Sequence, residues 1–275
     1  MAFDDIGCLL RGAGIPCCYK MILHAPPSWP ALVPNQRPEM CPRAALQAAN
    51  CTGADKRRRC GLYDDCMDIL TVGDGDFSFS LALARALYPD ASSAGRRIEG
   101  PGRLVATSHE SEASVLQVYP NAAATLAELR SRGVAVYHDV DATDLQTTLP
   151  PCTQQVPMRF HRVIWNFPCI GRGLEAGQDG QNTEMEANKQ LVRDFCCSAT
   201  PLLWPRRVGQ PGGGGEVHIT HKTKPPYNHW GLVPLAANAD TGLVWRGSVI
   251  FDRCSYPPYI NRKALGAPSR RRCPR

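Results

Sequence analysis

Two glycines and two aspartates alternate in a short loop after an apolar run, and this pattern suits a small-molecule site. The loop residues are Gly73, Asp74, Gly75, Asp76 and Phe77. Glycines let the backbone turn tightly and approach a ligand, and a helix that follows offers free N–H groups. The aspartates disfavour a diphosphate, and the Gly-Lys-Ser/Thr signature of a P-loop is absent. They suit a cofactor with positive charge and polar donors, such as S-adenosylmethionine; the alternative is a tight turn whose aspartates cap the helix.

Acidic residues also follow the next two apolar runs. Ser108 and Glu110 come after the second run, where a carboxylate accepts ribose hydroxyls in related folds, and Glu112 is a competing choice. Asp141 follows the third run and could accept from an adenine amino group, with Asp139 as its alternative. The structural alternatives are a surface carboxylate that begins a helix for Glu110 and an N-cap for Asp141. We expect Ser108, Glu110 and Asp141 to contact the cofactor.

A fourth run ends at Asn166, Phe167 and Pro168. This turn resembles the Asn-Pro-Pro-aromatic turn of nucleobase N-methyltransferases. An amide fits that role, because its oxygen accepts a ring or amino N–H while its NH2 donates to a carbonyl. Proline fixes the turn, and Phe167 could stack on a flipped base. A purely structural Asx turn is the alternative.

Cations, histidines and aromatic side chains gather at a fifth run. His218 lies inside it, and His221, Lys222, Lys224 and Tyr227 lie at or after its end. We expect the lysines to contact RNA phosphates and Tyr227 to stack on a base. The two histidines should face opposite sides of a strand, and each could simply be packed in the core. His221 is our candidate proton acceptor, because a histidine titrates near neutral pH.

The elements that must position these residues alternate between strand and helix patterns. Short β-rich runs at 69–72, 104–107, 134–137, 162–165, 216–220 and 243–251 predict strands, and patterns at 77–87, 121–132, 183–203 and 232–238 predict helices. This alternation is typical of an α/β fold with a mostly parallel sheet, helices on both faces and the first strand near the middle. The carboxyl ends of such strands share one rim, where the candidate residues should meet.

The chain of 275 residues is 43% hydrophobic and 20% charged, which excludes wholesale disorder. It holds no apolar run of 18 residues, so we expect no membrane-spanning helix, and its start does not look like a secretory signal. The net charge is +6, and residues 256–275 carry six basic residues and no acid. Within that stretch, Arg270, Arg271 and Arg272 suit an RNA backbone or a nuclear-import signal. The 13 cysteines predict free thiols, and without a Cys-x2-Cys pair we assign no metal site.

Three regions follow from these patterns. Residues 1–61 are rich in proline and cysteine without apolar periodicity, so we expect an irregular, flexible extension. Residues 62–263 should form the α/β domain, and residues 264–275 a basic tail.

Several long motifs together resemble one family in the same order. They are residues 69–80, 106–108, 166–168, 179–182 with 186–189, 215–227 and 256–259. The chain is thereby similar to the 25S ribosomal RNA (uridine-N3)-methyltransferase-like family over about residues 62–263. It departs from the family pattern at Cys169, where histidine is usual, and at Pro258, where glycine is usual.

The resemblance implies a class I, Rossmann-like methyltransferase with a seven-stranded-type sheet. Its cofactor would be S-adenosylmethionine and its substrate N3 of a uridine in large-subunit ribosomal RNA or a pre-ribosome. It also implies a role in ribosome biogenesis in the nucleolus, with the nucleus or cytoplasm as further locations. Carried over, residues 73–77 form the cofactor loop and residues 166–168 the target-base turn. Methylation of another RNA, such as transfer RNA, and a non-catalytic ribosome-assembly factor are the alternatives.

Overall fold

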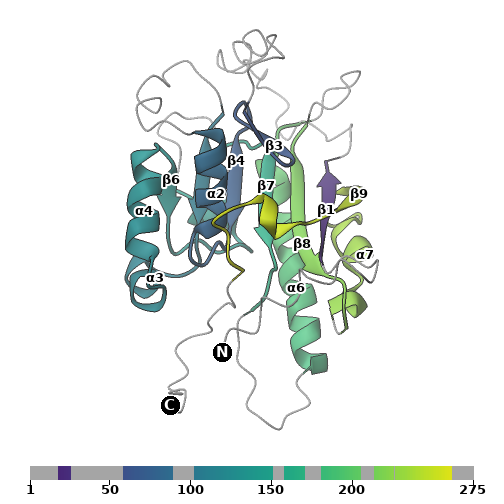
Figure 1. Ribbon diagram of the computed structural model, residues 1–275. Coiled ribbons are helices and arrows are strands. Elements are labelled where there is room, and N and C mark those ends of the chain that lie inside the picture. Colours follow the sequence, from purple (N-terminus) through teal and green to yellow (C-terminus); the bar gives the residue numbers. More distant parts are fainter. Residues whose placement is uncertain are drawn as a thin grey trace, which may run out of the picture.

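The computed structural model describes residues 18–25, 58–88, 102–150, 158–170, 181–205, 214–225 and 227–261. In this part of the chain, a seven-stranded sheet is flanked by helices on both faces (Figure 1). A two-stranded hairpin made of β2 (Arg59–Cys60) and β3 (Tyr63–Asp64) lies beside it. The architecture is mixed α/β, as the alternation of patterns predicts.

Five parallel strands form one side and the centre of the sheet. They are β4 (Ile69–Val72), β5 (Leu104–Thr107), β6 (Ala135–Tyr137), β7 (Arg162–Asn166) and β8 (Glu216–Lys222). Their order is β6-β5-β4-β7-β8, so the first predicted strand, β4, does lie centrally. All residues of β4 and β5 are buried, which explains why these strands read as continuous apolar runs in the sequence.

The sheet does not end at β8, and it is not entirely parallel. β1 (Cys18–His24) pairs antiparallel with β8 on one side and with the edge strand β9 (Val244–Ile250) on the other. The prediction of an irregular, flexible segment is therefore wrong for residues 18–24, and also for residues 59–60 in the hairpin. The sequence does not predict β1, because apolar and polar residues do not alternate along it. Lys20 is buried together with Met21 and Leu23.

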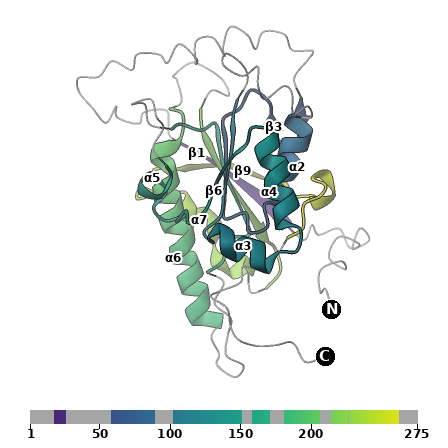
Figure 2. The same ribbon diagram turned by 90° about the vertical axis from the view of Figure 1, so that its left-hand side faces the viewer.

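The helices form a layer on each face of the sheet, as Figure 2 shows. One layer holds α2 (Ser78–Leu87), α3 (Glu112–Val118) and α4 (Ala122–Ser131). The other holds α5 (Leu145–Thr148), α6 (Gln181–Ala199) and α7 (Leu232–Ala236). Short 3-10 turns at Thr200–Leu202, Tyr227–Trp230 and Arg253–Ser255 complete the elements. Among the described residues, no helix combines the length and apolar character needed to cross a bilayer.

The four predicted helices correspond to α2, α4, α6 and α7, whereas α3 and α5 lie outside the predicted ranges, and two details differ. The helix expected at 183–203 ends as α6 at Ala199 and continues as a 3-10 turn, because Pro201 interrupts it. Asn121 precedes α4 as expected, but its side chain makes no capping hydrogen bond.

Successive strand residues point to opposite faces of the sheet, and this decides which candidate residues can meet. Val163 of β7 packs in the core that includes α6, whereas Ile164 packs in the core that includes α2. Asn166 lies on the same face as Ile164, the α2 face. Ile219 of β8 belongs to the α6 core, so His221, two residues further on, lies on the α6 face.

Candidate functional site

A single hollow lies at the carboxyl ends of the central strands and joins two of the predicted motifs. We call it the central hollow; it has about 370 Å³ of empty space, part of it open to solvent. Its lining residues are Thr71, Val72, Gly73, Asp74, Gly75, Asp76, Phe79, Ile164, Asn166, Tyr259, Ile260 and Asn261. The structure therefore brings the glycine loop and the asparagine turn to one place, and it adds a wall from the C-terminal part of the domain.

Both glycines of the loop are required by close approaches. Gly73 has φ +59°, and a Cβ there would lie 2.6 Å from Nε1 of Trp165. A Cβ on Gly75 would lie 2.8 Å from the hydroxyl of Tyr119. A Cβ at either position would thus meet side chains of the domain itself, and packing within the domain explains these glycines.

The two loop aspartates hold the start of α2 and also line the hollow. Oδ2 of Asp74 accepts from the backbone N–H of Ser80 (2.7 Å) and from its hydroxyl (2.5 Å), and Oδ1 of Asp76 accepts from the N–H of Ser78 (3.0 Å). Burial, with the adjacent charge of Asp76, raises the pKa of Asp74 to about 7. The helix-capping alternative is thus realised, and it leaves a half-buried acid that a nearby cation would help to ionise.

Phe77, the last residue of the predicted loop, is fully buried. It adopts φ 58° as the residue before α2, and its ring lies 5.3 Å from that of His138, edge to face. Phe77 therefore shapes the turn by packing and does not line the central hollow.

Glu110 offers an unpaired acceptor at the end of β5. The residue is buried, and within the described part of the chain its Oε2 has no hydrogen-bond partner. Burial raises the pKa of Glu110. Ser108 is also buried, and its hydroxyl accepts from the N–H of Glu110 (3.2 Å), which fixes the turn. A buried carboxylate oxygen without a partner is costly unless a ligand satisfies it, so Glu110 suits a hydroxyl group of a cofactor, although neither Glu110 nor Ser108 lines the central hollow.

Asp141 is less suited to the role predicted for it. Its side chain is exposed, and Oδ1 accepts from the N–H (2.8 Å) and hydroxyl (2.7 Å) of Thr143. It does not line the central hollow, and its alternative, Asp139, is exposed as well, with φ 56°. The side chain of Asp141 thus stabilises its own turn.

The amide of Asn166 is held in one orientation. Its Oδ1 accepts from Nζ of Lys20 (3.1 Å) and from the hydroxyl of Thr220 (2.6 Å). An ammonium group has hydrogens and no lone pair, so in that form of Lys20 the amide atom that faces it is the oxygen. The expectation that this oxygen accepts an N–H from a base is therefore corrected: the amide nitrogen is the group left for a ligand.

The two residues after Asn166 are folded inward. Phe167 has φ 56°, is half-buried, and its ring lies 6.1 Å from that of Phe251. Its N–H donates to the carbonyl of Thr220 (2.9 Å), and Pro168 is buried. Phe167 packs against the α2 core in this structure, which does not favour the predicted stacking on a base.

His221 lies away from Asn166, on the opposite face of the sheet. Its ring packs 4.6 Å from that of Trp230, and Nδ1 donates to the carbonyl of Lys222 (3.0 Å). Burial lowers its pKa to about 4. Both facts argue against His221 as the proton acceptor, and in favour of the packed-histidine alternative.

The predicted RNA-binding residues lie partly within the described chain. Nζ of Lys222 lies 4.8 Å from the centre of the Tyr227 ring, and Lys224 is exposed. Arg270, Arg271 and Arg272 lie outside the described residues.

Sequence reasoning missed two contributors to the site. Lys20 comes from β1, a strand the sequence did not predict, and its only local signal is a lysine within an otherwise apolar run. The second contributor is segment 259–261, which lines the hollow. Tyr259 ends the motif at 256–259 and the other two residues follow it, but no role for any of them follows from the sequence. The hydroxyl of Ser78 accepts from the N–H of Ile260 (3.1 Å), which ties this segment to α2.

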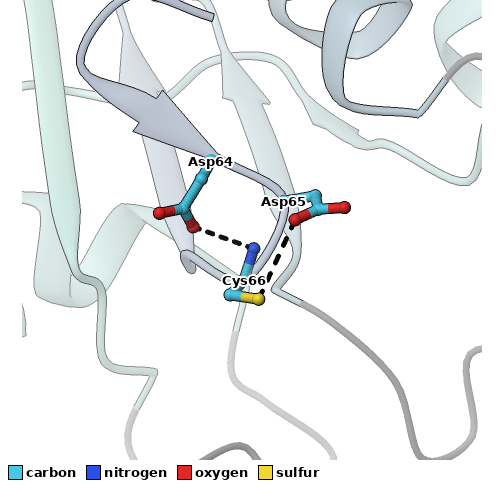
Figure 3. Close-up of side chains that lie close together, drawn as sticks. All are labelled: Asp64, Asp65 and Cys66. Atoms are coloured by element: carbon cyan, nitrogen blue, oxygen red, sulfur yellow. Dashed lines mark hydrogen bonds between the residues drawn. The ribbon is translucent and has the colours of Figure 1, made fainter. Parts of the chain in front are cut away.

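A small group of potential metal ligands lies after the hairpin, outside the central hollow. Figure 3 shows Asp64, Asp65 and Cys66, whose ligand atoms lie within 4.8 Å of one another. Oδ1 of Asp64 accepts from the N–H of Cys66 (3.0 Å), and the thiol of Cys66 donates to Asp65 (3.8 Å). These bonds explain the arrangement as a turn.

Residues 70–263 match the family described as rRNA (uridine-N3-)-methyltransferase BTM5-like. The chain is 34% identical over 211 residues to heavy metal-associated isoprenylated plant protein 41 of Arabidopsis thaliana, covering 77% of this chain and 35% of that protein. It is 30% identical over 204 residues to uncharacterized protein At4g26485 of the same plant, covering 74% of this chain and 85% of that protein.

A mouse protein extends the comparison. The chain is 31% identical over 180 residues to the ferredoxin-fold anticodon-binding domain-containing protein 1 homolog of Mus musculus, covering 62% of this chain and 24% of that protein. The chain thus spans about a third of the first plant relative and about a quarter of the mouse relative. No solved structure matches.

Proposed function

Because the chain belongs to the rRNA (uridine-N3-)-methyltransferase BTM5-like family, we propose that it methylates N3 of a uridine in large-subunit ribosomal RNA. The observation that carries this proposal is the central hollow, which the glycine loop and Asn166 line together. One motif suits a methyl donor and the other a base, and methyl transfer requires the two ligands side by side.

The residues at the rim fit S-adenosylmethionine as the cofactor. Glu110 holds a buried carboxylate oxygen without a partner in the described chain, which suits a ribose hydroxyl. Asp74 and Asp76 line the hollow with negative charge, which suits a sulfonium or an ammonium group. When bound, the cofactor would supply an electrophilic methyl group.

The protein's part in the reaction is to bind and orient the uracil. N3 of uracil lies between two carbonyl groups and must lose its proton, which would pass to the solvent that reaches the hollow, before it becomes a good nucleophile. The NH2 of Asn166 would donate to one of these carbonyls and stabilise the negative charge that develops there. The base must leave its stack to reach the hollow.

Lys222, Lys224 and Tyr227, together with Arg270, Arg271 and Arg272, would contact the RNA. Lysine and arginine neutralise phosphates without reading sequence, so these residues would position the RNA and leave base choice to the hollow. Action on ribosomal RNA would place the protein in the nucleolus.

The direct test is methylation of an unmodified large-subunit ribosomal RNA transcript, followed by nucleoside mass spectrometry. We expect 3-methyluridine from the full chain and a loss of about 100-fold in Asn166→Ala, with cofactor affinity unchanged in isothermal titration. Glu186→Gln, on the exposed side of α6, is the matched control.

Two outcomes would refute the proposal. Absence of cofactor binding would indicate a non-catalytic assembly factor. Cofactor binding without 3-methyluridine in the transcript or in pre-ribosomes would indicate another substrate. Because the mouse relative is named for an anticodon-binding domain, transfer RNA would then be the next substrate to test.

A further inference from the structure

Lys20 is a lysine enclosed in the interior of the domain. It is 1% exposed, although it lies on β1 near the carboxyl-end rim of β7 and β8. Nζ lies 4.6 Å from the ring centre of Phe251 and 5.0 Å from that of Phe79, so aromatic faces surround the amine. Burying a lysine is costly unless its donors are satisfied. The hydrogen bonds of Nζ therefore identify the groups that stabilise this buried lysine.

Two polar contacts satisfy the amine, and one of them reaches the site. Nζ donates to the hydroxyl of Tyr63 (2.8 Å) and to Oδ1 of Asn166 (3.1 Å). Thr220, directly across from Lys20 in the strand pairing, donates to the same Oδ1 (2.6 Å). Both contacts are made to Oδ1, so the NH2 is the end of the amide that neither of them uses.

Behind Lys20, a chain of buried polar groups holds the amine in place. The Tyr63 hydroxyl lies 3.2 Å from Nδ1 of His218, and Nε2 of His218 lies 3.0 Å from Glu216. Glu216 is paired with Arg162 (3.2 Å) and with Arg246. His218 and the ion pairs beyond it thus hold the Tyr63 hydroxyl in place, so this hydroxyl keeps its position next to Nζ of Lys20.

We propose that Lys20 is a positioning residue that sets the choice of base, because it holds the Asn166 amide with its NH2 toward the central hollow. The proposal rests on the proposed function for the identity of the substrate. An NH2 facing the hollow pairs with a ring carbonyl and repels an exocyclic amino group. The site would thus accept a base that presents a carbonyl to this NH2, such as O4 of uracil, and disfavour one that presents an amino group there, such as the C4 amine of cytosine or the C6 amine of adenine.

Either protonation state of the lysine can make the observed contact. Burial lowers the pKa of Lys20 well below its ordinary value. The neutral amine carries two hydrogens and the ammonium three, so both can donate to Oδ1 of Asn166; the ammonium, which has no lone pair, also excludes the flipped amide. Residues 18–24 also lie outside the family match, which begins at residue 70, so the match itself assigns no role to Lys20.

The test compares Lys20→Met and Thr220→Val with Lys189→Met as the control. Methionine keeps the length of the side chain without a donor, and Lys189 lies on α6, paired with Glu186. In the ribosomal transcript assay we expect kcat for uridine to fall about tenfold in each test variant, equivalent to about 1.4 kcal/mol. Cofactor affinity and thermal stability should match those of the control.

A second readout reports the amide itself. In the full chain labelled with 15N-asparagine, the side-chain NH2 signals of Asn166 are assigned by their loss in Asn166→Asp. We expect slow rotation of this amide in the wild type and faster rotation in Lys20→Met. A purely structural lysine would change stability without changing the rotation.

The outcomes separate the two proposals. If the wild type methylates uridine and Lys20→Met does so at the same rate, the role of Lys20 is refuted and the proposed function stands. If the wild type makes no 3-methyluridine but Lys20→Met releases the amide, the orienting role stands and the uridine substrate is refuted. Equal amide rotation in the wild type and Lys20→Met refutes the inference whatever the activity.

Discussion

Asp74→Asn gives the sharpest test of the electrostatics of the site, because this acid titrates near neutral pH. Burial and the charge of Asp76 raise the pKa of Asp74 from 3.8 to about 7. If a cationic cofactor binds only when Asp74 is ionised, its affinity must fall as the acid takes up a proton. One pH unit below the pKa this costs about tenfold, or about 1.4 kcal/mol. We therefore expect the affinity for S-adenosylmethionine to rise about tenfold between pH 6 and pH 8.

The assay is isothermal titration of the wild type and Asp74→Asn over that pH range. The variant keeps an oxygen that can accept from Ser80 but has no charge to titrate. Its remaining pH dependence comes from the cofactor and from other groups, so the difference between the two curves belongs to Asp74. Identical curves would show that Asp74 does not contact the cation, and would leave the acid as a helix cap only.

The same substitution also makes a prediction for stability. The folded pKa of Asp74 lies above its unfolded value, so folding takes up a proton and the folded state loses stability as pH rises from about 4 to about 7. The difference between 3.8 and about 7 corresponds to about 4 kcal/mol. Asp74→Asn should therefore leave the free energy of unfolding unchanged near pH 3 and raise it at pH 8. Denaturant titrations at both pH values measure this change.

Three further substitutions test separate parts of the site. Gly73→Ala should lower stability by about 1–3 kcal/mol in denaturant titrations, because of its positive φ and the short distance from its Cβ to Trp165. Glu110→Gln should weaken cofactor binding about tenfold with little change in melting temperature, because its unpaired oxygen makes no contact that folding depends on. His221→Phe should retain the ring packing on Trp230 and leave the pH profile of methyl transfer unchanged; loss of the acidic limb of the profile would restore His221 as the proton acceptor.

The parallel half of the sheet could be predicted because its signals are local. β4 is a short, fully buried apolar run that ends in a glycine turn. Gly133 follows the end of α4 with φ 73°, a conformation that commonly ends helices and that glycine adopts easily. β1 carries no such signal. Its partners, β8 and β9, lie about 200 residues further along the chain, and the burial of Lys20 depends on them. Only tertiary packing turns that segment into a strand.

The candidate site likewise has one part that the sequence predicts and another that it does not. That the glycine loop and Asn166 would meet follows from the rule that ligands bind at the carboxyl ends of parallel strands. The direction of the Asn166 amide does not follow from any local pattern, because a residue 146 positions away sets it. For Asp141, a local pattern exists but is ambiguous. Its sequence context fits a ligand and a turn equally well, and in the structure its side chain accepts from the N–H of Thr143.

Stability alone does not explain the residues around the central hollow. Lys20 is buried and Asp74 half-buried where their charged forms are disfavoured, and Phe167 adopts a positive φ that a non-glycine residue rarely takes. An apolar residue in place of a buried ion is often neutral or stabilising, so Lys20→Met should not unfold the protein. Costly features of three unrelated kinds thus gather at one rim, on segments from distant parts of the chain. Such a concentration is typical of sites that bind and react, and it is the physical reason to look for chemistry here.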